Sequence, residues 1–180
     1  MADLLIEQPK TMFGGNFESS YYSNEQRNEL EKGVDLDIRI PEGFVYSQKK
    51  FEEALDKVRG QQSRDWQEVI KNRQAGDTDQ AEWVDVREIK DTMETGGWSK
   101  LANDFGIDKQ FEYGRKLLAL GKYARKSLCQ QDELRLYGYE EGGRRKYGVE
   151  SGQHRILAAK VLAEMGCEVG LVNIKVIQVK

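Results

Sequence analysis

The sequence predicts an α+β fold in which a small mixed sheet is flanked by helices. Apolar and polar residues alternate over 82–89 and again over 134–149, and this period of two is typical of half-buried strands. Between and after these stretches, apolar residues recur at the i, i+4, i+7 spacing of amphipathic helices. A β-branched run over 171–179 predicts a closing strand. Both kinds of element therefore belong to one domain.

Residues 1–80 are predicted to form an N-terminal helical extension, and residues 81–180 the main domain. In the extension, alternation over 34–44 predicts a short strand that ends in a Pro-Glu-Gly turn. Helical spacing predicts a capped helix over 47–60 and a second, shorter helix over 63–76. Nothing in this part carries a recognisable chemistry, so we expect it to contact a protein partner.

The main domain is predicted to begin with a strand over 82–89, followed after a Gly-Gly turn by a helix over 99–105. A longer helix is expected over 109–127, where glycines weaken the prediction of an unbroken helix by about 1 kcal/mol each. A hairpin is then expected over 134–150, with its turn at Glu-Gly-Gly. An Ala- and Leu-rich helix over 153–165, ended by a glycine, leads into the last strand.

Composition excludes several classes of protein. The chain has 180 residues, 38% of them hydrophobic, and a formal net charge of -3, which gives no general electrostatic reason to bind nucleic acid. No apolar run approaches the roughly 20 residues that span a bilayer, so we expect no membrane insertion. The N-terminus lacks a signal-peptide pattern, and two cysteines make neither a disulfide framework nor a zinc cluster. We therefore expect a cytoplasmic protein without a protein-bound metal.

The chemically informative unit is the junction of strand, glycine turn and helix at Ser151, Gly152, Gln153, His154 and Arg155. A glycine lets the chain turn sharply and lets a ligand approach closely. The first amides of the following helix have no intrahelical partners, and the helix dipole adds about half a positive charge there. Arginine can grip two phosphate oxygens and histidine can donate or carry a proton. The pattern predicts a phosphate site; the alternative is an ordinary capped helix with a solvated face.

The segment YGVESGQHRILAAKVL resembles the phosphate-binding box of the ParB/sulfiredoxin superfamily, in which a strand ends in Gly-x-His-Arg and runs into a helix of small residues. The likeness is sharp over 134–166 and extends in outline over 82–179. It implies a ParB/sulfiredoxin-like fold. It also implies that Ser151, Gly152, Gln153, His154 and Arg155 bind the phosphates of ATP or another nucleotide, usually together with Mg²⁺.

Two departures from the family pattern narrow the reaction. Sulfiredoxins carry a catalytic cysteine where this chain has Gln153, so reduction of sulfinic acids is not expected. Partition-protein CTPases carry Glu-Arg-Arg after the glycine, whereas this chain has Gln-His-Arg. The resemblance thus favours an ATP-dependent phosphotransferase or NTPase. His154 is then one catalytic candidate, and Glu88, an acidic residue just after the first strand of the domain, is the other.

Two other functions stay open at this stage. A DNA-binding or nuclease-like accessory protein would use Arg144, Arg145 and Lys146 on the hairpin to contact backbone phosphate, beside the aromatic Tyr147. A non-enzymatic interaction protein, for example from a phage, would keep the fold without turnover. A solvated, charged hairpin tip is the simpler reading of the same three basic residues.

Overall fold

A computed structural model describes residues 4–5, 34–61, 79–92, 96–120, 122–124 and 134–179. Its helices are α2 (Gln48–Arg59), α4 (Gly97–Phe105), α5 (Ile107–Leu120) and α6 (Gln153–Glu164). Its strands are β1 (Leu4–Leu5), β2 (Val34–Arg39), β3 (Val45–Tyr46), β4 (Asp79–Asp85), β5 (Ile89–Thr92), β6 (Lys122–Ala124), β7 (Arg135–Glu141), β8 (Arg144–Ser151) and β9 (Glu168–Gln178). A 3-10 turn, Val86–Glu88, joins β4 to β5.

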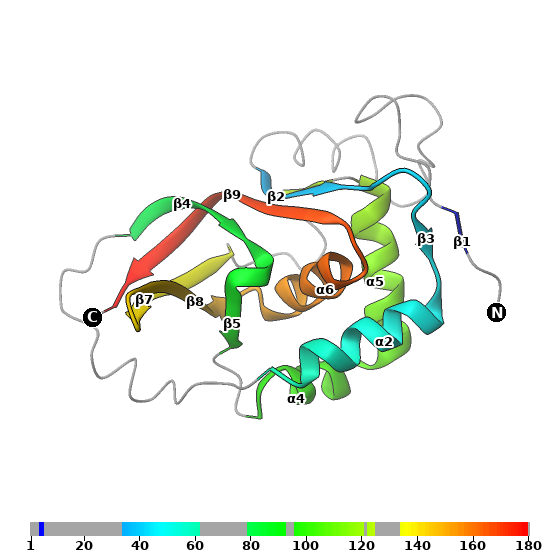
Figure 1. Ribbon diagram of the computed structural model, residues 1–180, viewed down its shortest axis with the longest axis horizontal. Coiled ribbons are helices and arrows are strands. Elements are labelled where there is room, and N and C mark those ends of the chain that lie inside the picture. The colour runs from blue at the N-terminus through cyan, green and yellow to red at the C-terminus, as the bar shows by residue number, and fades with distance from the viewer. Residues whose placement is uncertain are drawn as a thin grey trace.

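The long strand β9 organises a mixed sheet that has seven strands in the described part of the chain. The order is β5-β8-β7-β9-β2-β6, and β4 pairs with the other edge of β9. The pairs β5–β8 and β7–β9 are parallel, and the others are antiparallel. Figure 1 shows β4, β9, β7, β8 and β5 gathered at one end of the molecule and the helices at the other.

The sheet curls because β4 runs directly into β5. The strand β4 pairs with β9 and β5 pairs with β8, so the chain links two strands that have three other strands, β9, β7 and β8, between them in the sheet. The curl brings the inner faces of β4 and β8 close enough for Arg145 to hydrogen-bond Glu82. Polar side chains at this end of the sheet are therefore enclosed, although each belongs to a strand with ordinary alternation.

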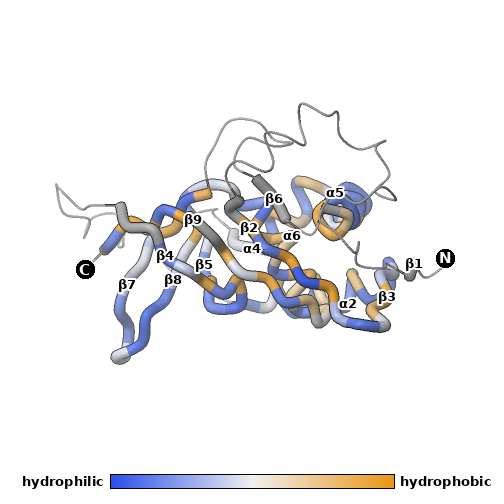
Figure 2. Tube along the Cα trace, turned by 90° about the horizontal axis from the view of Figure 1, so that it is seen from above, coloured by the Kyte–Doolittle hydropathy of each residue, from blue (hydrophilic) through white to orange (hydrophobic). Residues whose placement is uncertain are grey.

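The helix α6 is the centre of the core. Every residue from Arg155 to Ala163 is buried, which is the pattern of a helix covered on all sides. It packs between the sheet and the helices α2, α4 and α5 (Figure 1). In the hydropathy-coloured trace, the β7–β8 hairpin projects from this body as a mainly hydrophilic arm (Figure 2).

The predicted α+β class is confirmed, and the hairpin, the Ala-rich helix and the closing strand all form close to their expected positions. The strand expected over 82–89 is shorter, because the 3-10 turn interrupts it at Val86. The helix expected over 109–127 ends at Leu120. Residues 122–124 instead pair with β2, so sheet pairing overrides helix propensity there.

The sheet and core cross the boundary expected after residue 80. Strand β2 pairs with β9, and Phe51, Leu55 and Val58 of α2 lie in the same buried cluster as Ile156 of α6. Residues 34–59 are thus part of the main domain rather than an appended extension. The helix expected over 63–76 lies outside the described residues. No helix of the described segments has the length and apolarity needed to cross a bilayer.

Candidate functional site

The turn into α6 is built around Gly152. Its φ of +82° lies in the left-handed region, where side chains are disfavoured. A Cβ at this position would overlap Leu134 Cδ2 and would lie 3.1 Å from Arg155 Nη2. Gly152, rather than Ser151, occupies the N-cap, and no side chain caps the helix within the described residues. The N-cap residue of α6 therefore contributes no side-chain oxygen that would compete with a ligand for the first amides of the helix.

The Arg155 guanidinium lies beside this turn. The side chain is only 5% exposed, and it folds back from the first turn of α6 toward Gly152. A fixed positive charge is thus held next to the positive end of the helix dipole. Both features raise the potential at the same place, which favours an anion there.

His154 is held by packing as well as by its place in the first turn. Its ring lies 4.7 Å from the Phe105 ring between centroids, at an interplanar angle of 33°. Its carbonyl oxygen accepts a hydrogen bond from Gln110 Nε2 at 3.2 Å. Gln110 itself is fully buried on α5. The imidazole therefore packs against α4, while α5 holds the backbone of the same residue, and His154 is half-buried.

Glu88 lies at a distance from this turn. The register pairs Ile89 with Tyr147, five residues before Gly152 on β8, so Glu88 lies roughly 16 Å or more along the strand from the turn. Its side chain is exposed. Asp91, on the strand β5 that follows Glu88, is buried and accepts a hydrogen bond from the Tyr139 hydroxyl. The structure thus does not bring Glu88 to the box, and its catalytic role stays a prediction.

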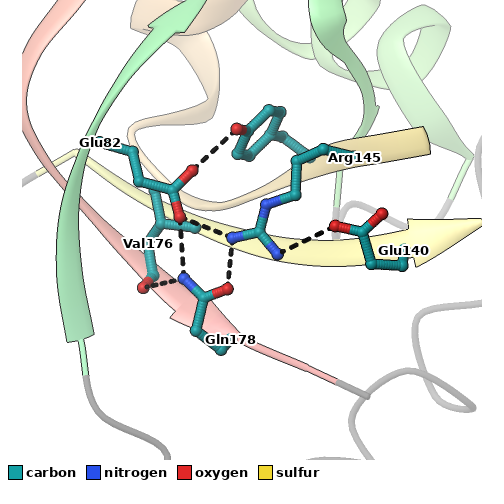
Figure 3. Close-up of polar contacts among 6 residues, drawn as sticks. Glu82, Glu140, Arg145, Val176 and Gln178 are labelled. Carbon is teal, nitrogen blue, oxygen red and sulfur yellow. Dashed lines mark hydrogen bonds and ion pairs between the residues drawn. The ribbon is translucent and has the colours of Figure 1, made fainter. Parts of the chain in front are cut away.

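The three basic residues of the hairpin do not form one surface. Arg144 is exposed, Lys146 forms an ion pair with Glu141, and Arg145 turns inward to Glu82. Figure 3 shows Arg145 pointing between the strands, toward Glu82 and Gln178. Two of the three charges thus have acidic partners in the chain, which reduces what the hairpin can offer to a nucleic-acid backbone.

Arg145 is the centre of a polar group that we call the Glu82–Arg145 network, formed by Glu82, Arg145, Tyr147 and Gln178. Glu82 accepts hydrogen bonds from Arg145 Nη2 at 2.6 Å, from the Tyr147 hydroxyl at 2.8 Å and from Gln178 Nε2 at 2.9 Å. Arg145 Nη2 also bonds Gln178 Oε1 (Figure 3). Burial alone would raise the pKa of Glu82, but these three hydrogen bonds outweigh it and hold the pKa below its ordinary value.

The Glu82–Arg145 network requires a residue without a side chain on β7. A Cβ at Gly138 would overlap the Arg145 guanidinium, so only glycine leaves room for the arginine over the sheet. The sequence gives a weak signal of this arrangement, because Arg145 alternates in step with the core-facing Tyr147 and Val149. The residue pattern predicts a surface charge at Arg145 and does not indicate its partners on two distant strands.

Replacing Arg145 with alanine is expected to lower the free energy of unfolding by about 1–2 kcal/mol, since hydrogen bonds to a charged, partly enclosed carboxylate are lost. Arg144→Ala is the matched control and should leave stability unchanged. Urea unfolding of both variants measures the difference. Equal stability of the two variants would show that the network contributes nothing, and a double-mutant cycle with Glu82→Gln would then find no coupling.

A cleft of about 360 Å³ includes Phe105, whose ring contacts the ring of His154. Besides Phe105 at the end of α4, it is lined by residues of α5: Asp108, Lys109, Glu112, Tyr113 and Lys116. Phe105 and Tyr113 meet edge to face, with centroids 6.1 Å apart. A second cleft of about 420 Å³ lies on the other side of the α4–α5 junction and has no aromatic lining among its described residues.

Within the described ranges, no group of three or more His, Cys, Asp or Glu side chains is placed to hold a metal ion. Comparison with known proteins adds no further assignment. No family model, no curated protein and no solved structure matches this chain. The function therefore has to be argued from the arrangement around α6 itself.

Proposed function

We propose that this chain is a nucleotide-binding protein of the ParB/sulfiredoxin type that holds the phosphates of its ligand at the first turn of α6. The observation that carries the proposal is the convergence of two features at one point. The glycine turn opens the helix N-terminus, and the buried Arg155 guanidinium lies beside it. Each alone is common, but together they supply the backbone donors and the fixed charge that a phosphate needs.

Phosphoryl transfer or nucleotide hydrolysis is the reaction that such a site would serve. His154 lies in the first turn of α6, and we propose it as the proton carrier, oriented by its contact with Phe105. ATP is the first candidate ligand, with Mg²⁺ carried in mainly by the phosphates, because the described residues hold no acidic cluster for it. A protein that binds without turnover is the main alternative. The DNA-binding alternative has less support, because Arg145 and Lys146 already pair with acidic residues.

A ligand-dependent shift in melting temperature tests binding. ATP, ADP, CTP and GTP, each with Mg²⁺, should be added to the purified chain at rising concentration. A ligand at 100 times its Kd stabilises the folded state by about 2.7 kcal/mol, which is readily detected. No shift with any of the four nucleotides would count against the proposal. Product formation measured in the same samples separates an enzyme from a binding protein.

The variant Gln153→Glu is expected to weaken nucleotide binding at least tenfold while leaving the fold intact or slightly more stable. The substitution is nearly isosteric, and a carboxylate in the first turn of α6 complements the helix dipole by about 0.3–1 kcal/mol. The same charge repels a phosphate placed there, at a cost of about 1–4 kcal/mol.

Gln153→Ala is its matched control, because it removes the amide without adding charge. It should keep most of the affinity, and calorimetry on the three proteins compares them directly. If Gln153→Glu bound nucleotide as tightly as the wild type, the phosphates would have to lie elsewhere.

A further inference from the structure

We propose that the cleft lined by Phe105, Lys109, Tyr113 and Lys116 binds the nucleoside part of the ligand whose phosphates meet α6. The inference rests on the proposed function, since it extends the same site, and it names the second half of the ligand. Phosphate contacts at a helix N-terminus cannot distinguish a nucleotide from inorganic polyphosphate. A separate surface for base and ribose is required for that distinction.

The cleft and the phosphate turn meet at Phe105. Phe105 lines the cleft, and its ring also lies against the ring of His154, which belongs to the first turn of α6. One side chain therefore separates the two halves of the site. Gln110 adds a second link, because it lies on α5 next to the cleft-lining Lys109 and its amide bonds the His154 carbonyl oxygen.

Size and chemistry suit a nucleoside. A volume of about 360 Å³ lies at the lower end of the range for small-molecule sites, large enough for one base and its sugar. Aromatic faces bind every base by stacking, and the half-buried Phe105 supplies one, supported by the buried Tyr113 that packs edge to face with it. The charged side chains of the lining are balanced, since Lys109 and Lys116 lie among Asp108 and Glu112. The lysines can donate to ribose or phosphate oxygens, and the carboxylates can accept from the ribose hydroxyls.

The second cleft lacks these properties. It is lined by Glu52, Ala102, Asn103, Gly106, Ile107 and Asp108, with no described aromatic surface and no lysine. Its described charged residues, Glu52 and Asp108, are both acidic, whereas the cleft at Phe105 balances its two carboxylates, Asp108 and Glu112, with two lysines. The contact with His154, the stacking surface and this difference in charge therefore favour the cleft at Phe105.

The test compares a nucleoside triphosphate with inorganic tripolyphosphate, which carries the same phosphate chain without base or ribose. Affinities are measured by calorimetry with Mg²⁺ present, using whichever of ATP or CTP binds more tightly. The wild type is expected to prefer the nucleotide at least tenfold, the order of magnitude that one stacked base supplies.

The variant Phe105→Leu should remove most of this preference, because it takes away the aromatic face and keeps an apolar side chain. Lys109→Trp is a second variant at an exposed position, where a bulky ring fills the cleft without entering the core. Phe111→Leu is the matched control, since it is the same substitution at an aromatic residue of the neighbouring helix α5 that packs on Tyr46 and Phe51 instead of lining the cleft. It should retain the preference.

The outcomes separate the two proposals. If neither ligand binds the wild type, the phosphate site itself is refuted, and the inference falls with it. If both ligands bind equally well, the phosphate site stands and the cleft is excluded as a nucleoside site. Full preference in both Phe105→Leu and Lys109→Trp would likewise place the base elsewhere.

Discussion

Replacing Gly152 with alanine is expected to lower the free energy of unfolding by about 2–5 kcal/mol, as measured by urea denaturation. Two effects add. The residue has a φ of +82°, and forcing a side chain into the left-handed region costs about 1–2 kcal/mol. The new methyl group would also overlap Leu134 Cδ2 in a closed environment, and overpacking of this kind costs about 1–3 kcal/mol.

Gly143→Ala is the matched control. Gly143 has a φ of +72°, but no atom lies within 4 Å of a Cβ built there, so only the backbone cost applies. The free energy of unfolding of Gly143→Ala should therefore fall by about 1–2 kcal/mol. If Gly152→Ala cost no more than Gly143→Ala, the overlap with Leu134 would be refuted. The double variant Gly152→Ala/Leu134→Ala should show a favourable coupling, because the smaller residue relieves the overlap.

The sequence was sufficient to predict the local geometry of this turn and insufficient to predict what closes over it. A strand, a glycine and an Ala-rich helix are local patterns, and each formed as expected. The contact of Leu134 with Gly152 and the return of Arg155 over the turn depend on how β7 lies beside β8. Side-chain placement of this kind follows from strand register, which residue spacing does not specify.

Local residue patterns also fail to predict pairing between distant segments, and this explains two of the differences between the predicted and the observed fold. Residues 122–124 are predicted to end a helix. In the fold they pair with the edge of β2, and the backbone hydrogen bonds of this pairing outweigh the small free-energy preference of these residues for a helix. Residues 34–59 read as an extension because their patterns are short. They join the main sheet only through β9, which lies at the opposite end of the sequence. Long-range pairing decided both cases.

Glu82 and Arg145 illustrate how tertiary structure changes the meaning of a residue. In the sequence, Arg145 lies between two other basic residues at a hairpin, and a surface role is the natural interpretation. In the fold, the curl from β4 into β5 brings Glu82 opposite it, and Gly138 makes room for the guanidinium. A potential nucleic-acid contact thus becomes part of the link between three strands.

Lys160 is a second residue whose environment the sequence did not reveal. It lies in the middle of α6 with 2% of its surface exposed, and its ammonium donates to the carbonyl oxygen of Ile89 at 2.5 Å. It also lies 5.4 Å from the centroid of the Trp98 ring. The hydrogen bond of Lys160 therefore links the central helix α6 to the backbone at the start of β5. Burial, followed by the positive charge of Lys90, lowers the pKa of Lys160 from 10.5 to about 7.

This environment predicts that stability rises with pH above neutrality. Below the folded-state pKa of about 7, the lysine is protonated in both folded and unfolded chains, so it gives no pH dependence. Between about 7 and 10.5 the unfolded chain binds the proton and the folded chain does not, so raising the pH favours folding. The gain between pH 7 and pH 9 should be about 2 kcal/mol, measured by urea unfolding at several pH values.

The variant Lys160→Met should lose this gain, whatever its absolute stability. Cys167 acts in the opposite direction near pH 9, because burial raises the pKa of its thiol to about 12, but it is present in both proteins and cancels from the comparison. Lys90→Met is the matched control: it keeps the buried lysine and removes its nearest positive neighbour, so the pKa of Lys160 should rise and the gain should begin at higher pH. A flat profile in the wild type, or an unchanged slope in Lys160→Met, would show that the ammonium stays protonated within the fold and that the carbonyl oxygens around it offset the cost of its burial.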